Sequence, residues 1–215
     1  MVLAAGEGLR MRPLTEDTPK PLLKVQGEPL LAHQINLLKS QVSSIAVTVG
    51  YMSEKVSSFA LQNGADYVIN NIGGGNASWL NRSMFRQCNF QILVITCDNL
   101  MSVDLADIEA ESRIKPRLSY LISRTSGPGI KGDRIHQTFS RVNAISQEES
   151  VDSLATGLQV INPGTLSTNR RFETFHDVWN DLIGSDLLFE SRNHPTEWAA
   201  IDTPEDLMAA NVAKK

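Results

Sequence analysis

The sequence predicts an α/β fold with a mostly parallel central sheet flanked by helices, and three observations support this prediction. Apolar runs rich in β-branched residues recur at residues 45–49, 66–70 and 92–96, as expected of strands. Amphipathic stretches alternate with these runs, as in a series of β-α-β units. The last run, ILVIT, lacks polar alternation, which is typical of a central parallel strand covered on both faces. The 215 residues, 41% of them hydrophobic, suffice for one domain with a sizeable core.

Three helices are expected in the first half of the chain. Residues 29–40 and 53–62 carry apolar side chains at helical spacing, so each predicts a helix with one buried face. A third helix is expected after Asn76, which would serve as its N-cap. Its buried face would consist of Trp79, Leu80 and Met84.

After about residue 115 the pattern changes to strand-rich segments, RLSYLIS at 117–123 and RIHQTFSRVNAIS at 134–146. Four residues mark a loop between them: Gly127, Pro128, Gly129 and Gly132. We interpret this part as a small, partly antiparallel insertion in a single domain that covers residues 1–215. A C-terminal helix is predicted over residues 203–215, because Thr203 can cap it and Pro204 suits its first position.

The loop after the first apolar run is the strongest functional signal. It reads GEGLRMRPLT, and its glycines, Gly6 and Gly8, let backbone N–H groups approach an anion without side chains in the way. Arg10 offers a planar fork that matches phosphate oxygens. Lys20 offers a point charge, held near the loop by the prolines on either side of it. These residues predict a loop that binds a phosphate chain.

Other kinds of glycine-rich loop fit the sequence less well. A G-x-G after a strand also opens dinucleotide-binding folds, but Met11 stands where their third glycine belongs, and Pro13 interrupts the expected helix. The GxxxxGK[ST] string of a Walker-type loop occurs nowhere in the chain. A plain structural turn without a ligand stays open as an alternative.

The segment LAAGEGLRMRPLTEDTPKPLLKVQGEPLL, residues 3–31, resembles the opening signature of the sugar-1-phosphate nucleotidyltransferases. It contains LAAG-x-G-x-R, P-L-T, P-K-P-L-L and G-x-P-L-L strings in the family's order and spacing. Later segments extend the resemblance over nearly the whole chain, closest in form to the short N-acetylmuramate-1-phosphate uridylyltransferase and mannose-1-phosphate guanylyltransferase-like members. The resemblance implies a Rossmann-like nucleotidyltransferase fold. About residues 1–115 would then bind the nucleotide and about 116–200 the acceptor.

Two aspartates are candidate ligands of Mg²⁺. Asp98 directly follows the strand at 92–96, where a carboxylate can hold Mg²⁺ against a phosphate or can simply cap a helix. The family has an aspartate at this place, so the resemblance implies the metal role. Asp202 lies in EWAAIDTPEDLMAAN, which resembles the family's W-x-D-x-G-T-P-E-D-L segment. The chain departs from the family at Cys97, where glycine is commoner, and at Thr203, which follows the aspartate with no glycine between.

The triple glycine at residues 73–75 resembles the family's nucleobase-binding turn, although a flexible loop is an alternative. Asn71 and Ile72 replace the acidic residue and threonine usual before this turn, so the identity of the base stays open. The resemblance implies that the nucleotide is bound by Leu3, Ala4, Ala5, Gly6, Gly8, Asn71, Gly74 and Gly75.

The segment LATGLQVINPGTLS, residues 154–167, is similar to the strand and turn that cradle the sugar in this family. The acceptor contacts that it implies are Thr156, Gly157 and Asn162. The E-K-P string, whose lysine touches the sugar phosphate in several members, is absent, and SQEES stands in its place. Short uridylyl- and guanylyltransferases also lack this string.

The resemblance implies an enzyme in which a sugar-1-phosphate oxygen displaces pyrophosphate from an NTP. Arg10 would hold the β- and γ-phosphates, Lys20 would bridge the α-phosphate and the acceptor, and Mg²⁺ on the two aspartates would offset negative charge. UTP with an N-acetylmuramate 1-phosphate-like acceptor is favoured. One alternative is a phosphocholine-type cytidylyltransferase, which the pair Asn70 and Asn71 suggests. Another is a regulatory subunit that binds a nucleotide without turnover.

Composition argues against several other classes of protein. The net charge of −4 disfavours a general nucleic-acid-binding surface. Cys88 and Cys97 lack metal-ligand spacing and are expected to be free thiols. No apolar run has the length of a membrane span, and no signal peptide is recognised. We therefore expect a cytoplasmic protein without nucleic-acid or membrane partners, as a monomer or small homo-oligomer.

Overall fold

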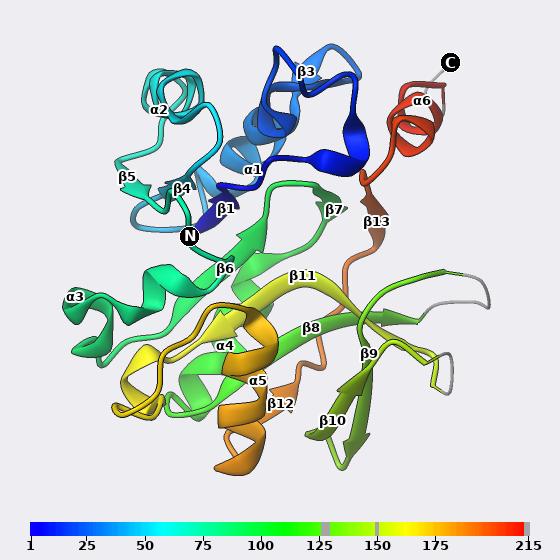
Figure 1. Cartoon of the computed structure of the whole chain (residues 1–215). Helices are drawn as coiled ribbons and strands as arrows, with labels where there is room; N and C mark the ends of the chain where they lie inside the picture. The colour runs from blue at the N-terminus through cyan, green and yellow to red at the C-terminus, as the bar shows by residue number, and fades with distance from the viewer. Residues whose placement is uncertain (126–129, 149–150, 213–215) are drawn as a thin grey trace. The chain divides into compact units, whose positions relative to one another are not determined.

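The computed structural model describes residues 1–125, 130–148 and 151–212 (Figure 1). The chain forms two compact units: unit 1 contains residues 1–73, 95–102 and 197–215, and unit 2 contains residues 74–94 and 103–196. The predicted loop at Gly127, Pro128 and Gly129 lies outside the described residues, as do the last three residues of the predicted C-terminal helix. The assignment of nucleotide and acceptor binding to parts that divide near residue 115 stays a prediction.

Unit 1 is built on parallel strands in the order β5-β4-β1-β6. Their bounds are β1 Val2–Ala4, β4 Ala46–Val49, β5 Tyr67–Asn70 and β6 Ile92–Thr96, of which the last two residues belong to unit 1. Val2 lies between Val47 and Ile95 in the ladder, and all three side chains are fully buried. The predicted parallel strands are therefore confirmed, because their apolar side chains form the core of this unit.

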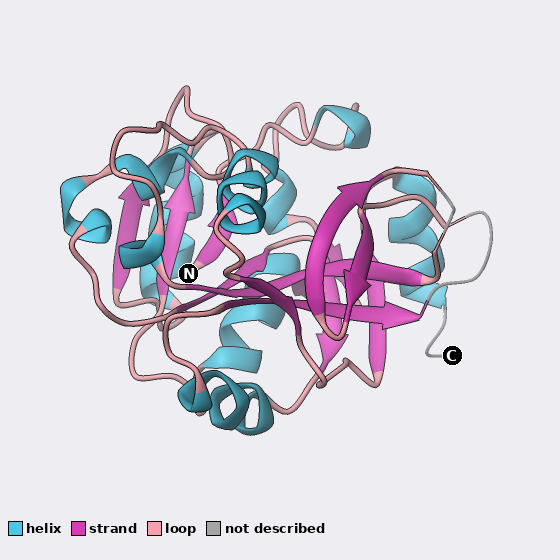
Figure 2. Cartoon of the chain, turned by 90° about the horizontal axis from the view of Figure 1, so that it is seen from below, coloured by secondary structure: helices cyan, strands magenta, loops and turns pink. Residues whose placement is uncertain are grey.

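The two predicted helices of unit 1 are confirmed as α1, Leu30–Leu38, and α2, Ser53–Gln62 (Figure 1). Figure 2 draws the helices of the chain in cyan and its strands in magenta. α1 buries Leu31, Ile35 and Leu38, as its spacing predicts. The remaining elements of the unit are η1 Leu9–Met11, η2 Lys20–Leu22, β2 Lys24–Val25, β3 Glu28–Pro29, β7 Asn99–Ser102, β13 Glu197–Ala200 and α6 Pro204–Val212.

Unit 2 contains a mixed sheet in the order β11-β8-β12-β10-β9. Its strands are β8 Ser119–Thr125, β9 Arg134–Thr138, β10 Arg141–Ser146, β11 Ser153–Ile161 and β12 Leu188–Glu190. β8 runs antiparallel to β11 and parallel to β12, and β9 with β10 forms an antiparallel pair. This arrangement confirms the strand-rich, partly antiparallel region predicted after residue 115.

The helical elements of unit 2 are η3 Ser78–Asn81, α3 Ser83–Arg86, α4 Leu105–Ile114, η4 Pro163–Thr165 and α5 Phe175–Gly184. The prediction of one helix capped by Asn76 is wrong. Arg82 is extended and separates η3 from α3, so helical spacing does not continue across it. Met84 is consequently 64% exposed, and Phe85 packs against Trp79 in its place, with ring centroids 4.8 Å apart. The side chain of Asn76 accepts the N–H of Phe175 at 3.0 Å and caps nothing in η3.

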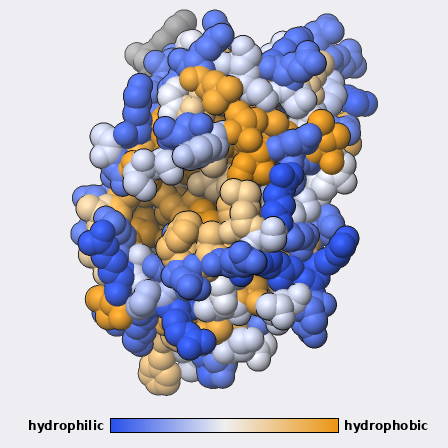
Figure 3. All heavy atoms as spheres, turned by 90° about the vertical axis from the view of Figure 1, so that its left-hand side faces the viewer, coloured by the Kyte–Doolittle hydropathy of each residue, from blue (hydrophilic) through white to orange (hydrophobic). Residues whose placement is uncertain are grey.

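Across the described ranges, no helix has the length and apolar content needed to cross a membrane. Figure 3 shows hydrophilic residues over much of the visible face, with hydrophobic residues gathered between them. The exposed large apolar side chains include Tyr67 on β5 of unit 1 and Met84 on α3 of unit 2. Exposed apolar side chains are ordinary on a protein surface.

Candidate active site

The glycine-rich loop leaves β1 and turns sharply at Gly8, whose φ of 64° lies in the left-handed region. The Gly8 carbonyl accepts the N–H of Met11 at 2.9 Å and the hydroxyl of Thr15 at 3.0 Å, which closes the loop on itself. A Cβ atom on Gly8 would lie 2.9 Å from Cβ of Lys20. Glycine is therefore required here both by the backbone conformation and by the close approach of Lys20.

The loop presents backbone donors that the protein does not use. In the part of the chain that the structure describes, the N–H groups of Gly6, Glu7 and Gly8 make no hydrogen bond. A Cβ atom on Gly6 would meet nothing within 4 Å. Successive free N–H groups beside open space form a concavity suited to an anion, as the sequence predicts.

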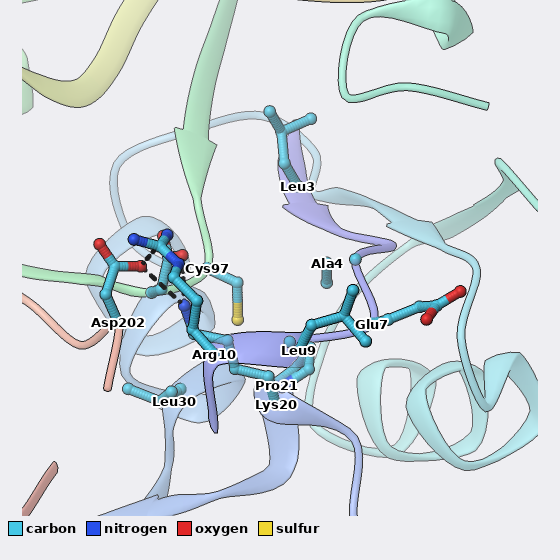
Figure 4. A pocket seen from close by; sticks show the side chains of 13 residues that line it. Leu3, Ala4, Glu7, Leu9, Arg10, Lys20, Pro21, Leu30, Cys97 and Asp202 are labelled. Atoms are coloured by element: carbon cyan, nitrogen blue, oxygen red, sulfur yellow. Dashed lines mark hydrogen bonds and ion pairs between the residues drawn. The ribbon is translucent and has the colours of Figure 1, made fainter. Parts of the chain in front are cut away.

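Four charged side chains converge beside this loop, and Figure 4 labels three of them, Arg10, Lys20 and Asp202. The ammonium of Lys20 donates to Asp98 Oδ2 at 2.7 Å and to Asp202 Oδ1 at 3.1 Å. Arg10 Nη2 donates to the same oxygen of Asp202 at 2.9 Å. The Lys20 side chain is 13% exposed and the Arg10 side chain 71% exposed. Lys20 is thus held by two carboxylates in a largely buried position, whereas Arg10 is held by one and lies open to solvent.

A short antiparallel ladder brings the two aspartates together although they are far apart in sequence. Asn99 at the start of β7 pairs with Ala200 at the end of β13. The N–H of Ile201 then donates to the carbonyl of Asp98 at 2.9 Å, which extends the ladder by one bond. Asp98 and Asp202 therefore leave adjacent backbones at the same end of the ladder, and their carboxylates share one ammonium.

A capping box at the start of α6 orients the backbone of Asp202. Asp206 Oδ2 accepts the N–H of Asp202 at 3.0 Å, and it accepts the N–H and hydroxyl of Thr203 at 2.8 and 3.0 Å. The Asp206 N–H donates back to the Thr203 hydroxyl at 3.2 Å, which confirms the predicted helix start. Partial burial raises the pKa of Asp206, but these hydrogen bonds outweigh it, so the pKa lies below its ordinary value.

Replacing Asp206 by alanine is expected to destabilise the protein at pH 7 by about 1 kcal/mol, as for loss of a cap. Because the pKa of Asp206 is lower in the folded state, its stabilising contribution is present above the unfolded-state pKa. That contribution disappears as the pH falls through the folded-state pKa. Denaturant unfolding of both proteins from pH 7 to pH 2.5 measures the difference. A difference that stays constant across this range would contradict the assignment.

The charged cluster opens into a pocket of about 620 Å³. All of its lining residues belong to unit 1: Leu3, Ala4, Gly6, Glu7, Gly8, Leu9, Arg10, Lys20, Pro21, Leu30, Cys97, Asp98 and Asp202. In Figure 4 the Glu7 carboxylate points away from Arg10 and Asp202. Burial raises the pKa of the Cys97 thiol, and Asp98 raises it further, so this sulfur is a neutral thiol at neutral pH.

The structure therefore brings together Arg10, Lys20, Asp98 and Asp202 with most of the predicted loop residues. Ala5 is absent from the pocket lining; its carbonyl accepts the Tyr51 N–H at 3.1 Å instead. Asn71 follows β5, is buried, and donates its N–H to the carbonyl of Val49 at 2.7 Å. Its contact with a nucleobase stays a prediction.

Gly74 and Gly75 belong to unit 2, where a second segment of the chain packs on their turn. The Gly75 N–H donates to Glu173 Oε2 at 3.2 Å, and the Ala77 N–H donates to the Glu173 carbonyl at 3.1 Å. A Cβ atom on Gly75 would lie 2.0 Å from that carbonyl oxygen. Close packing against the Glu173 backbone is therefore sufficient to require glycine at residue 75, with or without a ligand at this turn.

The three predicted acceptor contacts lie on and after β11 of unit 2. The Thr156 hydroxyl donates to the carbonyl of Ile122 at 2.7 Å. The Asn162 side chain caps η4 by accepting the Gly164 N–H at 3.0 Å. Gly157 has a φ of 80° where the register between β11 and β8 shifts. These roles hold the strand together, and contact of the three residues with an acceptor stays a prediction.

Tyr51 and Lys55 support the glycine-rich loop and were not expected to do so from the sequence. The Tyr51 hydroxyl donates to the carbonyls of Thr15 and Glu16 at 3.1 and 3.3 Å. Lys55 Nζ donates to the carbonyl of Asp17 at 2.7 Å. Tyr51 lies just before α2 and Lys55 in its first turn, so their position in the fold brings them here and no local sequence signal reveals the role.

The residues of the site fit a bound Mg²⁺. Asp98 and Asp202 lie close enough to share the Lys20 ammonium, and hard oxygen donors such as theirs are the ligands that this ion prefers. Within the described residues, no group of three or more His, Cys, Asp or Glu side chains is arranged to hold a metal. The site would therefore supply two ligands and leave the remaining positions to water and phosphate oxygens, which is how Mg²⁺ is usually bound beside nucleotides.

The chain is similar in sequence to two uridylyltransferases. A UTP–glucose-1-phosphate uridylyltransferase from Synechocystis is 25% identical, with 98% of this chain and 61% of that protein aligned. An N-acetylmuramate α-1-phosphate uridylyltransferase from Neisseria meningitidis is 42% identical over 71 residues, which cover 33% of this chain and 30% of that protein. The chain thus spans less than two thirds of the length of either relative.

Solved structures show the same fold at lower sequence identity. The CTP:phosphocholine cytidylyltransferase from Streptococcus pneumoniae superposes with a TM-score of 0.72 at 20% identity, covering 98% of this chain and 96% of that one. The model of the MobA-like NTP transferase domain matches residues 1–118, the part that supplies Arg10, Lys20 and Asp98. Since this match covers more than half of the 215 residues, the chain belongs to the MobA-like NTP transferase domain family.

Proposed function

We propose that the protein catalyses Mg²⁺-dependent transfer of a nucleotidyl group from an NTP to a sugar 1-phosphate. The convergence of Arg10, Lys20, Asp98 and Asp202 beside a loop with free backbone donors carries this proposal. Such a set of residues can hold a phosphate chain, neutralise it and present its α-phosphorus. The pocket volume of about 620 Å³ is also in the range of small-molecule sites.

The reaction forms one P–O bond and breaks another. An oxygen of the sugar 1-phosphate attacks the α-phosphorus of the NTP, and the bond from that phosphorus to the bridging oxygen of the β-phosphate breaks. Pyrophosphate leaves with both electrons of that bond, and the product is an NDP-sugar. The attacking oxygen is already anionic, so no general base is required. Catalysis then consists of positioning and charge neutralisation.

Each charged side chain has a distinct task in this proposal. Lys20 is nearly buried and points between the two aspartates, so it is preorganised to bind the oxygens around the α-phosphorus. Arg10 is largely exposed, and its planar guanidinium can donate two parallel hydrogen bonds, which suits the β- and γ-phosphates. Asp98 and Asp202 would hold Mg²⁺, which when bound supplies positive charge to the phosphate oxygens. The N–H groups of Gly6 and Gly8 would add uncharged donors.

Within this class we favour UTP and an N-acetylmuramate 1-phosphate-like acceptor. The similarity to the Neisseria uridylyltransferase and the absence of the E-K-P string support this choice. A phosphocholine-type cytidylyltransferase is the second candidate, because the fold of the Streptococcus cytidylyltransferase covers nearly the whole chain and Asn70 and Asn71 precede the glycine turn. A regulatory subunit without turnover is less consistent with the presence of all four charged residues.

Pyrophosphate release tests the proposal and separates the candidates. UTP, GTP, CTP and dTTP are crossed with N-acetylmuramate, mannose, glucose and N-acetylglucosamine 1-phosphates and with phosphocholine, with and without Mg²⁺. Turnover with UTP and an amino-sugar 1-phosphate is the expected result. Turnover only with CTP and phosphocholine would favour the second candidate. Tight nucleotide binding without turnover for any pair would favour the regulatory subunit and overturn the proposed activity.

Replacing Gly6 by alanine is expected to weaken NTP binding while leaving stability unchanged. The added methyl group meets no protein atom within 4 Å, but it occupies the space where a phosphate would approach the loop. We expect the Kd for the NTP to rise about tenfold or more, which corresponds to about 1.4 kcal/mol. Calorimetric titration and thermal unfolding provide the two measurements. Gly184→Ala is the control, because its methyl group is equally unhindered and lies at the end of α5. Unchanged affinity in the Gly6 variant would mean that the loop does not contact the phosphates.

A further inference from the structure

One polar side chain in the core of unit 1 is not explained by packing. Gln34 on α1 is 1% exposed, and the helix buries it together with Leu30, Leu31, Ile35 and Leu38. Its Nε2 donates to the carbonyl of Asn99 at 2.9 Å, but its Oε1 has no hydrogen-bond partner among the described residues. A buried acceptor without a partner destabilises the folded protein. An apolar residue would avoid this cost, so the amide donor at Gln34 calls for a reason other than stability.

The amide of Gln34 holds the turn that carries Asp98. Asn99 lies directly after Asp98, and β7 is paired on one edge with β13. The Asn99 carbonyl accepts a hydrogen bond from Gln34 Nε2, so the side-chain amide supplies the bond that a neighbouring strand would otherwise supply.

From Asn99 the hydrogen bonds continue to the carboxylate. Asn99 Nδ2 donates to the hydroxyl of Thr96 and to Asp98 Oδ1, the latter at 3.2 Å. With Oδ1 held by Asn99, the other oxygen of Asp98 faces Lys20 at 2.7 Å. Hydrogen bonds therefore connect Gln34, on the buried face of α1, through Asn99 to the carboxylate of Asp98.

We propose that Gln34 is a positioning residue that orients Asp98 through Asn99, an inference that rests on the proposed function of that carboxylate as a metal ligand. Gln34 touches neither nucleotide nor metal. Its donor sets the backbone of the turn, and its orphaned oxygen is the cost of placing a donor in an apolar core. Groups that orient metal ligands typically change metal affinity or activity by about 10- to 100-fold when removed.

Gln34→Met tests this inference, because methionine keeps the length of the side chain and removes both the donor and the orphaned acceptor. Three quantities are measured: the unfolding temperature, the Mg²⁺ concentration for half-maximal turnover, and the affinity for Mn²⁺ by electron paramagnetic resonance with a non-hydrolysable NTP. We expect an unfolding temperature equal to or above that of the wild type. The half-maximal Mg²⁺ concentration and the Kd for Mn²⁺ should each rise about tenfold.

His33→Phe is the matched control. His33 is the preceding residue of the same helix, and its side chain also bonds a backbone carbonyl, that of Val25 at 3.0 Å. Its loss removes a comparable bond, one made to β2 and not to the Asp98 turn, so metal affinity should stay within twofold of the wild type.

The outcomes separate this inference from the proposed function. Metal affinities within twofold of the wild type in Gln34→Met would overturn the positioning role. A lowered unfolding temperature with normal metal affinity would overturn it too and leave a structural role. If the wild type shows no turnover but binds Mn²⁺ with the NTP analogue, and Gln34→Met binds it about tenfold more weakly, the positioning role holds while the proposed activity fails. A wild type that binds no Mn²⁺ would overturn the positioning role.

Discussion

Lys20→Met is expected to lower turnover by about 10²–10³, the usual effect of losing one preorganised electrostatic group. Lys20 is less exposed than Arg10, the other basic residue of the site, and both aspartates contact its ammonium. In the variant these two carboxylates lose their common cation, so the charge on the α-phosphate is no longer offset at a fixed position. Steady-state kinetics with saturating NTP and Mg²⁺ measure the change. We expect most of the loss in kcat, because a group that acts at the α-phosphorus stabilises the transition state more than the bound substrate.

Lys24→Met is the matched control for this variant. Lys24 is an exposed lysine on β2, four residues further along the chain and outside the pocket lining. Its loss removes the same formal charge from unit 1, so turnover should stay within twofold. Circular dichroism shows whether both variants are folded at the assay temperature. If Lys20→Met retains more than a tenth of the wild-type kcat, Lys20 does not act at the reacting phosphate.

Gly75→Ala is expected to lower the stability of the folded protein, whatever its effect on activity. The added Cβ atom would lie 2.0 Å from the carbonyl oxygen of Glu173 and 2.8 Å from its carbon. Both are backbone atoms, so a rotamer change cannot relieve the clash. Overpacking of this kind typically costs about 1–3 kcal/mol, and occasionally more. Thermal unfolding should show a drop of about 2–4 °C per kcal/mol for a chain of this size.

Glu173→Gln separates the backbone clash from the side-chain contact. The glutamine keeps an acceptor for the Gly75 N–H and leaves the backbone unchanged, so stability should be close to that of the wild type. Should Gly75→Ala unfold at the wild-type temperature, the close packing of the two segments would be disproved. The glycine would then have to be explained by the nucleotide instead.

Much of unit 1 is predictable because its signals are local. Each strand is a short run of apolar β-branched residues, and α1 and α2 show their buried faces by spacing alone. The glycine-rich loop and the aspartate after β6 are also adjacent to a strand in sequence, so chemistry at the end of a strand is enough to identify them. The prediction of one helix after Asn76 also relied on a local pattern, and it was wrong. Arg82 is extended and interrupts the helical spacing that the pattern assumes to be continuous.

The sequence by itself determined the fold class and singled out the glycine-rich loop with four charged residues, Arg10, Lys20, Asp98 and Asp202, for which phosphate and metal binding stay predictions. Only the tertiary structure decided how they meet, because the register between β7 and β13 places Asp202 beside Asp98. It also decided that Gln34 is a polar residue in an apolar core, aimed at Asn99, and that Gly75 packs on Glu173. These contacts join residues that are distant in sequence, and no local pattern of spacing or propensity encodes which distant partner a side chain will meet.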